Sequence, residues 1–183
     1  IMRKPPDSDI KEFQRFIWDY FDSDGREFPW RDTDNHLHAL VAEIMLQQTS
    51  YYQVLPQYKS FCESYIKPED VITENTEELE NYFEGLGLQS RAEYVKCAAK
   101  YLIETDEITQ EELLKVKGIG KYTANAFMSV HIEKRYPIVD GNVLRVLQER
   151  FEVDEELKTS DDEIWELAWD LLPEIDVREY NLG

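Results

Sequence analysis

The most distinctive segment of the sequence is residues 114–124, in which Gly118 and Gly120 flank one isoleucine between two stretches of helical pattern. Glycine permits positive backbone dihedrals and lets a phosphate approach the main chain, and the helix that follows points free amide groups and its positive dipole end outward. Lys117 and Lys121 add positive charge. Such a turn could hold a phosphate without reading a base sequence. A plain helix-turn-helix corner has the same pattern, because a glycine pair alone is a weak motif.

Two carboxylates are candidates for acid–base chemistry. Glu43 lies in an apolar helical stretch, and Asp140 precedes a Gly-Asn pair. When one carboxyl has a raised pKa and the other stays ionised, the two can donate a proton at one atom and stabilise positive charge at another. Both residues also have a structural interpretation. A glutamate on a helix is usually solvated, and an aspartate before Gly-Asn usually forms a turn or caps a helix.

The elements that position these residues are predicted to be helices. Apolar residues recur three and four positions apart, and strand-type alternation is scarce. The fold class is therefore all-α. The predicted helices cover residues 9–22, 37–49, 51–64, 76–84, 90–103, 110–115, 121–132, 141–150 and 160–172.

Composition indicates a cellular location for the protein and argues against a nucleic-acid partner. The 183 residues carry a formal net charge of -19, so the molecule as a whole should be repelled by a polyanion. The hairpin lysines nevertheless lie close together, and a local basic face can exist on an acidic protein. Cys62 and Cys97 have no metal-type spacing, and no apolar run reaches membrane-spanning length, which indicates a reducing intracellular or cytoplasmic location, associated with the nucleoid if DNA is the partner.

Several segments together resemble one family. Residues 116–124 and 138–146 resemble the hairpin and catalytic-aspartate signature of the helix-hairpin-helix (HhH-GPD) DNA glycosylases, which include endonuclease III, MutY-type adenine glycosylases and archaeal thymine mismatch glycosylases. Segments 28–31, 43–49 and 85–92 follow the family's order and approximate spacing. The resemblance implies an endonuclease III-like fold of two helical lobes with a DNA-binding cleft between them. Its six-helix lobe would span 36–134 with the hairpin at 114–124, and 1–35 with 135–183 would form the second lobe.

The resemblance also assigns roles to individual residues. Asp140 would stabilise the sugar cation or orient water, and Glu43 would protonate the departing base. Flipping a nucleotide leaves a hole in the base stack. Gln48 would fill that hole, with Leu88 wedging from the other side. The remaining DNA-binding residues implied are Gly118, Gly120, Lys117, Lys121, Arg31 and Asn142.

The residue type at position 122 distinguishes base removal alone from base removal followed by strand cleavage. The lyase branch of the family has a nucleophilic lysine at this place, and a phenol cannot form the Schiff base that cuts the strand. Lys121 is one residue away, but a helix turns it by roughly 100° towards another face. The resemblance therefore implies base removal without strong lyase activity, with Tyr122 packing against the flipped nucleotide or, alternatively, serving as ordinary helix packing.

The implied function is a monofunctional DNA glycosylase of base excision repair, a hydrolase that releases adenine, thymine or uracil opposite guanine from double-stranded DNA. Residues 45–49 are closer to the adenine type and residues 88–92 to the thymine type, so the base stays open. Alternatives are a glycosylase for a modified base in foreign DNA, such as phage DNA, or a non-catalytic DNA-binding module. We expect a monomer, no metal, and a [4Fe–4S] cluster only if the natural chain continues past Gly183 with four cysteines.

Overall fold

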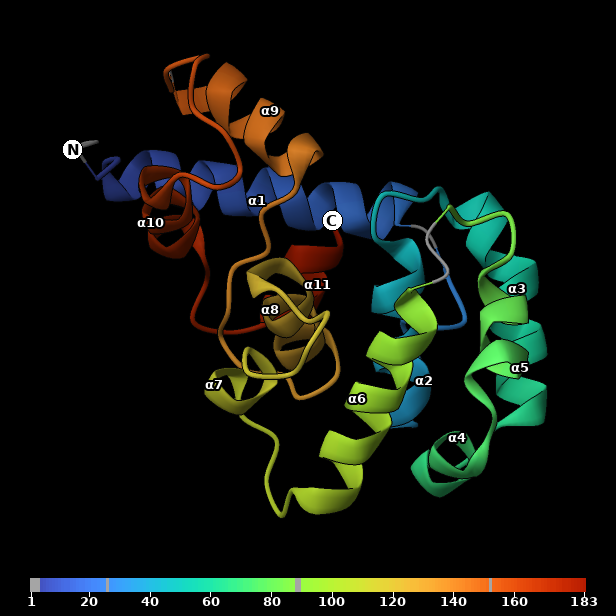
Figure 1. Ribbon diagram of the computed structural model, residues 1–183. Helices are drawn as coiled ribbons and strands as arrows, with labels where there is room; N and C mark the ends of the chain where they lie inside the picture. The colour runs from blue at the N-terminus through green and yellow to red at the C-terminus, as the bar shows by residue number, and fades with distance from the viewer. Residues whose placement is uncertain (1–3, 26, 88–89, 152) are drawn as a thin grey trace. The chain divides into compact units, whose positions relative to one another are not determined.

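The computed structural model describes residues 4–25, 27–87, 90–151 and 153–183. All regular elements in these ranges are helices, and the ranges contain no strand, so the predicted all-α class is confirmed (Figure 1). The chain divides into two compact units. Unit 1 contains residues 1–27 and 128–183, and unit 2 contains residues 28–127.

Unit 2 is built around an almost wholly apolar helix. Helix α2 (His36–Leu46) is buried on nearly every side, as expected for a helix without a polar face. It packs against α3 (Tyr51–Ser64) and α6 (Arg91–Glu104), which flank it in Figure 1. The remaining elements of this unit are α4 (Pro68–Thr73), α5 (Thr76–Glu80), the 3-10 helix η1 (Asn81–Phe83), α7 (Gln110–Leu113) and the first seven residues of α8 (Lys121–Val130).

Side-chain caps fix where helices of unit 2 begin. Asn35 accepts hydrogen bonds from the amides of Leu37 and His38 at 3.0 and 3.2 Å. Asn75 accepts one from the amide of Glu77 at 3.1 Å and so starts α5. Each cap satisfies an amide that has no partner inside its own helix.

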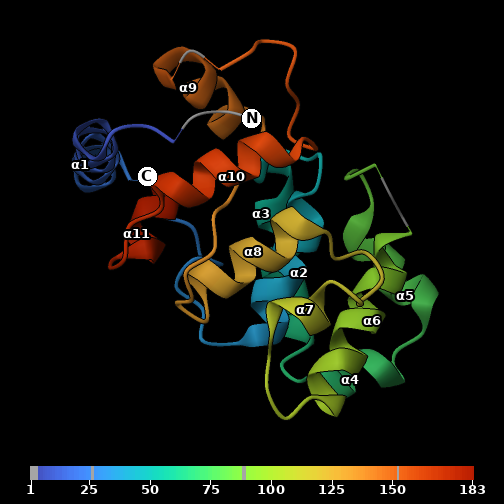
Figure 2. The ribbon, with the colours of Figure 1, turned by 90° about the vertical axis from the view of Figure 1, so that its left-hand side faces the viewer.

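Unit 1 contains α1 (Asp7–Asp24), α9 (Gly141–Phe151), α10 (Asp162–Leu171) and α11 (Val177–Leu182), and α1 packs against α10 and α11. Figure 2 shows α10 continuing towards α11 near the C-terminus. Apolar residues three and four apart on these helices form one core together with residues of the flanking loops. The core includes Ile10, Phe13, Leu147, Ile164, Leu167 and Leu171 from the helices and Val139 and Val153 from the loops.

The unit boundaries differ from the predicted ones. They fall at 27/28 and 127/128, whereas the resemblance implied 35/36 and 134/135. Residues 28–35 belong to unit 2 because Trp30 is buried there, with its ring edge-on to Tyr58 at 5.3 Å. The end of α8 belongs to unit 1, where Ser129 accepts a hydrogen bond from the Asn181 amide at 2.6 Å.

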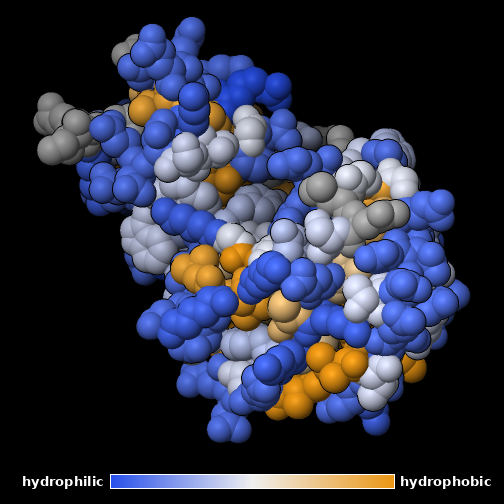
Figure 3. Space-filling view, viewed as in Figure 1, coloured by the Kyte–Doolittle hydropathy of each residue, from blue (hydrophilic) through white to orange (hydrophobic). Residues whose placement is uncertain are grey.

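Polar side chains cover most of the face shown in Figure 3, and apolar ones appear on it only in separate patches. No helix in the described ranges is long and apolar enough to cross a membrane.

Candidate functional site

The two glycines of the hairpin between α7 and α8 play different structural parts. Gly118 has φ of 89°, and a Cβ added there would overlap the ring of Tyr94, so both conformation and space require glycine. Gly120 is not among the residues with positive φ, and a Cβ there would meet no atom within 4 Å. Of the two properties of glycine that the sequence analysis named, Gly118 therefore uses the positive dihedral, and Gly120 does not. Its open surroundings fit the other expectation, close approach of a ligand to the main chain.

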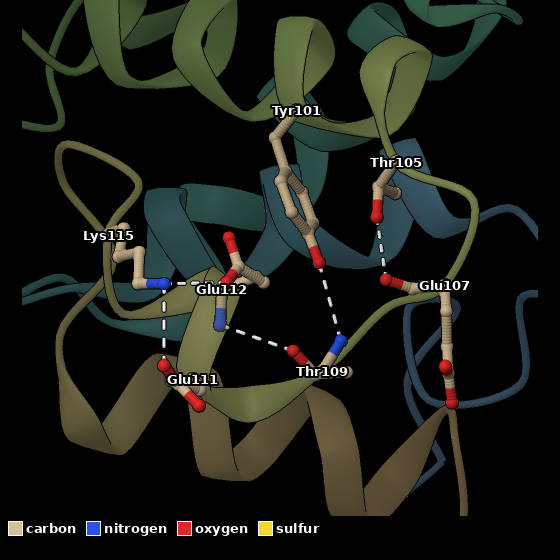
Figure 4. Close-up of polar contacts among 7 residues, drawn as sticks. All are labelled: Tyr101, Thr105, Glu107, Thr109, Glu111, Glu112 and Lys115. Carbon is tan, nitrogen blue, oxygen red and sulfur yellow. Dashed lines mark hydrogen bonds and ion pairs between the residues drawn. The ribbon is translucent and has the colours of Figure 1, made fainter.

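Figure 4 shows how the chain enters the hairpin. The hydroxyl of Thr109 accepts a hydrogen bond from the Glu112 amide at 3.2 Å and caps α7, while the Tyr101 hydroxyl accepts one from the Thr109 amide at 3.4 Å. At the far end of the short helix, Lys115 Nζ lies 2.6 Å from a Glu112 carboxylate oxygen and 3.4 Å from one of Glu111. The first hairpin lysine is therefore already neutralised by neighbouring carboxylates.

The second hairpin lysine, Lys117, is also paired with a carboxylate. Lys117 Nζ lies 2.9 Å from a carboxylate oxygen of Glu93 on α6, and this contact raises the pKa of the lysine. Both side chains of the pair are more than half exposed to solvent. Lys121, at the start of α8, is also exposed. Charge around the hairpin is thus balanced locally rather than concentrated as a basic patch.

The turn after α2 is held by a buried arginine that the sequence analysis did not single out as functional. Helix α2 ends at Leu46, so the predicted helix to residue 49 is wrong, and Gln48 stands in a turn. Arg91 is only 1% exposed, and its guanidinium donates to the carbonyls of Met45 and Gln47 and to the Thr49 hydroxyl. A cation at the carbonyl end of a helix is favourable, which accounts for a buried charge here.

A second contact joins this turn to the hairpin. Gln47 Nε2 donates to the Gly118 carbonyl at 2.9 Å and lies 3.4 Å from the Thr123 hydroxyl. Gln48, the next residue, has φ of 57° and an exposed side chain. Gln47 is therefore anchored to the hairpin, and Thr49 is anchored to Arg91. Gln48 between them is the tip of a fixed turn. Leu88, the predicted wedge, lies outside the described residues.

Glu43 has the electrostatic property expected of a general acid. It lies on α2 between Ala42 and Ile44, both fully buried, and is itself partly buried. Desolvation by burial raises its pKa from 4.5 to about 7, and the positive charge of Arg31 opposes this rise. The Glu43 carboxyl therefore holds its proton more tightly than an exposed glutamate does.

Asp140 lies in unit 1 and begins helix α9. One of its carboxylate oxygens accepts a hydrogen bond from the Val143 amide at 2.8 Å, and its carbonyl accepts one from the Leu144 amide at 2.9 Å. Because α9 fixes the carboxylate by its first turn, the predicted capping interpretation and a catalytic role are compatible. The exposed Asn142 lines a mainly apolar cavity of about 170 Å³ in the same unit.

The structure brings most of the predicted residues into one unit. Unit 2 contains Glu43, Arg31, Gln48, Lys117, Gly118, Gly120, Lys121 and Tyr122. Tyr122 is 38% exposed at the start of α8, so its side chain is not buried packing. Unit 1 contains Asp140 and Asn142. In the ranges that the structure describes, no three His, Cys, Asp or Glu side chains gather as metal ligands would.

The contacts between the turn after α2, the hairpin and Arg91 define an all-helical unit with a fixed hairpin, and comparison with known proteins identifies its family. Residues 41–174 match the model of the HhH-GPD superfamily base excision DNA repair proteins. The chain belongs to this superfamily. The predicted helix-hairpin-helix fold and the predicted glycosylase function in base excision repair are thereby confirmed.

Individual relatives are similar over different lengths. The thymine/uracil-DNA glycosylase of Methanothermobacter thermautotrophicus is 32% identical over 179 residues, 94% of this chain and 81% of that protein. The solved structure of a thermostable thymine-DNA glycosylase is 31% identical with a TM-score of 0.87, covering 96% of this chain and 84% of that one. The adenine DNA glycosylase of Mus musculus is 31% identical over 156 residues, 76% of this chain but only 30% of that protein.

Proposed function

We propose that this protein is a monofunctional DNA glycosylase that hydrolyses the bond between deoxyribose and a mispaired base. The observation that carries the proposal is the Glu43 carboxyl, whose pKa of about 7 lets it hold a proton at neutral pH and give it up during the reaction. A carboxyl that only solubilised the surface would have no reason to be desolvated on a buried helix.

The reaction breaks the bond between the sugar C1′ and a ring nitrogen of the base. The bonding electron pair leaves with the base, and Glu43 donates a proton to a ring nitrogen so that the base departs neutral. Positive charge develops on the sugar, and the role implied for Asp140 by the family resemblance is to stabilise this charge. Water then adds to C1′ and loses a proton. The products are the free base and an abasic site in an uncut strand.

Adenine is the first candidate for the released base. The adenine anion is a poor leaving group, so its departure depends on protonation, and the raised pKa of Glu43 supplies an acid suited to this step. Thymine or uracil is the second candidate. The specific observation in its favour is the similarity to a thymine/uracil-DNA glycosylase over 94% of this chain.

The proposal excludes a strong lyase step because of Tyr122. This residue stands at the beginning of α8 with its side chain 38% exposed, at the place where the lyase branch has its lysine. A phenol cannot form a Schiff base with the opened sugar. We therefore assign Tyr122 to contact with the flipped nucleotide.

Double-stranded DNA is the proposed partner, bound by the hairpin and by the turn at Gln48. The open main chain at Gly120 and the amino end of α8 suit one phosphate. Gln48 is exposed at the tip of a turn fixed on both sides, which suits a side chain that enters a base stack. Flipping costs a few kcal/mol, and a rigid intruding residue offsets part of that cost.

The test is single-turnover cleavage of end-labelled duplexes that carry A:G, A:8-oxoguanine, T:G or U:G pairs, with and without alkali. We expect strand breaks only after alkali, from one class of duplex, and their loss in Asp140→Asn, in which asparagine still caps α9. Glu63→Gln, a change of an exposed glutamate on α3, serves as the matched control and keeps full activity. Breaks without alkali would overturn the monofunctional assignment, and no product from any duplex would overturn the mismatch proposal.

A further inference from the structure

Five aromatic rings of unit 2 form a continuous row, here called the aromatic row: Tyr58, Trp30, Phe28, Tyr51 and Tyr52. The Tyr58 and Trp30 rings meet edge to face at 5.3 Å, and Trp30 stacks on Phe28 at 5.0 Å with an interplanar angle of 11°. The Phe28 and Tyr51 ring centroids are 4.8 Å apart, and those of Tyr51 and Tyr52 are 3.8 Å apart.

The row runs from the core to the surface. Tyr58 and Trp30 are 3% and 4% exposed, Phe28 and Tyr51 are partly buried, and Tyr52 is 73% exposed. Tyr52 is the most exposed large hydrophobic side chain in the described ranges. One face of its ring lies on Tyr51, so most of the exposed area belongs to the other face and the edge. Burial of apolar area does not account for a tyrosine in this position.

The exposed end of the row adjoins the turn assigned to DNA. Tyr52 lies in the first turn of α3, which begins directly after the turn that carries Gln48. The Arg31 guanidinium lies over the Phe28 ring at 4.9 Å, so the row also carries a positive charge. Aromatic rings beside cationic groups form the usual platform for unstacked bases, because every nucleobase has a π face and the backbone beside it is anionic.

We propose that Tyr52 stacks on the base that loses its pairing partner when the target nucleotide is flipped. The proposal rests on the proposed function and adds a positioning residue to it. Gln48 enters the helix, and the neighbouring Tyr52 receives the orphan base on its outer face. The row behind Tyr52 supports the ring, since Tyr51 and Phe28 connect it to the rigid core at Trp30. Stacking does not read hydrogen bonds, so the contact accepts any orphan base.

The test measures the dissociation constants of the wild type, Tyr52→Ala and Tyr52→Phe for three duplexes. The first carries an orphan base opposite an abasic analogue, the second is fully paired, and the third has abasic analogues on both strands. Loss of one base–aromatic stack is worth about 1–3 kcal/mol. We therefore expect Tyr52→Ala to bind the orphan-base duplex about 5- to 150-fold more weakly, and Tyr52→Phe to bind it like the wild type.

The other two duplexes contain no orphan base, so Tyr52→Ala should bind them as the wild type does. The matched control is Tyr20→Ala, which removes another exposed tyrosine that is not part of the row. Unchanged binding of the orphan-base duplex by Tyr52→Ala, or an equal loss on all three duplexes, would overturn the proposal. If the wild type releases a base but Tyr52→Ala binds normally, only this inference fails. If the wild type releases none, the proposed function fails independently.

Discussion

Replacement of Glu43 by glutamine tests whether burial prepares this carboxyl for catalysis. Glutamine has nearly the same shape as protonated glutamic acid, but it cannot ionise. Burial raises the Glu43 pKa from 4.5 to about 7, so the folded protein binds a proton at this position more tightly than the unfolded chain does. Ionisation of Glu43 therefore destabilises the fold, and this cost increases as the pH rises from 4.5 to 7.

The size of the effect follows from the pKa difference. A shift of roughly 2.5 pKa units corresponds to about 3 kcal/mol at about 1.4 kcal/mol per unit. Below pH 4.5 the wild type and Glu43→Gln should have similar free energies of unfolding. Above pH 7 the variant should be more stable than the wild type by up to about 3 kcal/mol, and Glu63→Gln should show no such pH-dependent gain.

Two assays check this reasoning. Urea unfolding between pH 4 and 9 gives the difference in stability, and single-turnover base release over the same range gives the rate constant. The wild-type rate constant should fall about tenfold per pH unit above pH 7 as the acid deprotonates, and the variant should lose about 10²- to 10⁴-fold. A stability difference that does not grow with pH would refute the role of burial. A flat wild-type rate profile would refute the general acid.

Four further substitutions test the hairpin and the turn. Gly118→Ala should destabilise the fold by about 1–3 kcal/mol in thermal or urea unfolding, because the methyl group meets a ring at positive φ; Gly120→Ala should preserve stability but weaken DNA binding, and equal DNA affinity would contradict close phosphate approach. Arg91→Lys keeps the charge, but an ammonium group lacks the planar fork that bonds three acceptors, so the substitution should destabilise the fold by about 1–3 kcal/mol; a stable variant with normal base release would show that the turn needs no such anchor. Glu93→Gln releases Lys117, so the slope of log K against log salt should steepen by about 0.9; an unchanged slope would place Lys117 away from the phosphates.

The long helices were predictable from sequence because their apolar periodicity comes directly from burial. The stretch predicted at 51–64 coincides with α3, and the one at 141–150 falls one residue short of α9. The short helices α4 and α11 were not predicted, since six residues contain too few turns for a periodic signal. The end of α2 was misplaced for a different reason: Arg91, 42 residues beyond Thr49, determines it.

The candidate site was partly predictable in the same sense. Local sequence motifs contain the hairpin glycines, Glu43 and Asp140. The family resemblance then gave these residues specific roles in catalysis and DNA binding. Arg91 and Gln47 lay within the matched segments, but their role as anchors depends on contacts between distant elements and has no local signal. The pKa of Glu43 is equally non-local, because it depends on burial of the carboxyl in the folded unit and on the charge of Arg31.

The acidic composition that argued against DNA binding has a different meaning in the structure. Two lysines of the hairpin form ion pairs with glutamates: Lys117 pairs with Glu93, and Lys115 pairs with Glu112. Their positive charges are therefore already balanced before DNA binds. A phosphate must compete with these carboxylates, which weakens the sequence-independent electrostatic attraction. In the proposed function, the affinity then comes from contacts that depend on geometry: the open main chain at Gly120, the fixed turn at Gln48 and the aromatic row. Of these proposed contacts, Gln48 and the aromatic row act only where a base has left the stack. An acidic surface that weakens the general attraction to phosphate would therefore favour discrimination between damaged and intact DNA over tight binding to any duplex.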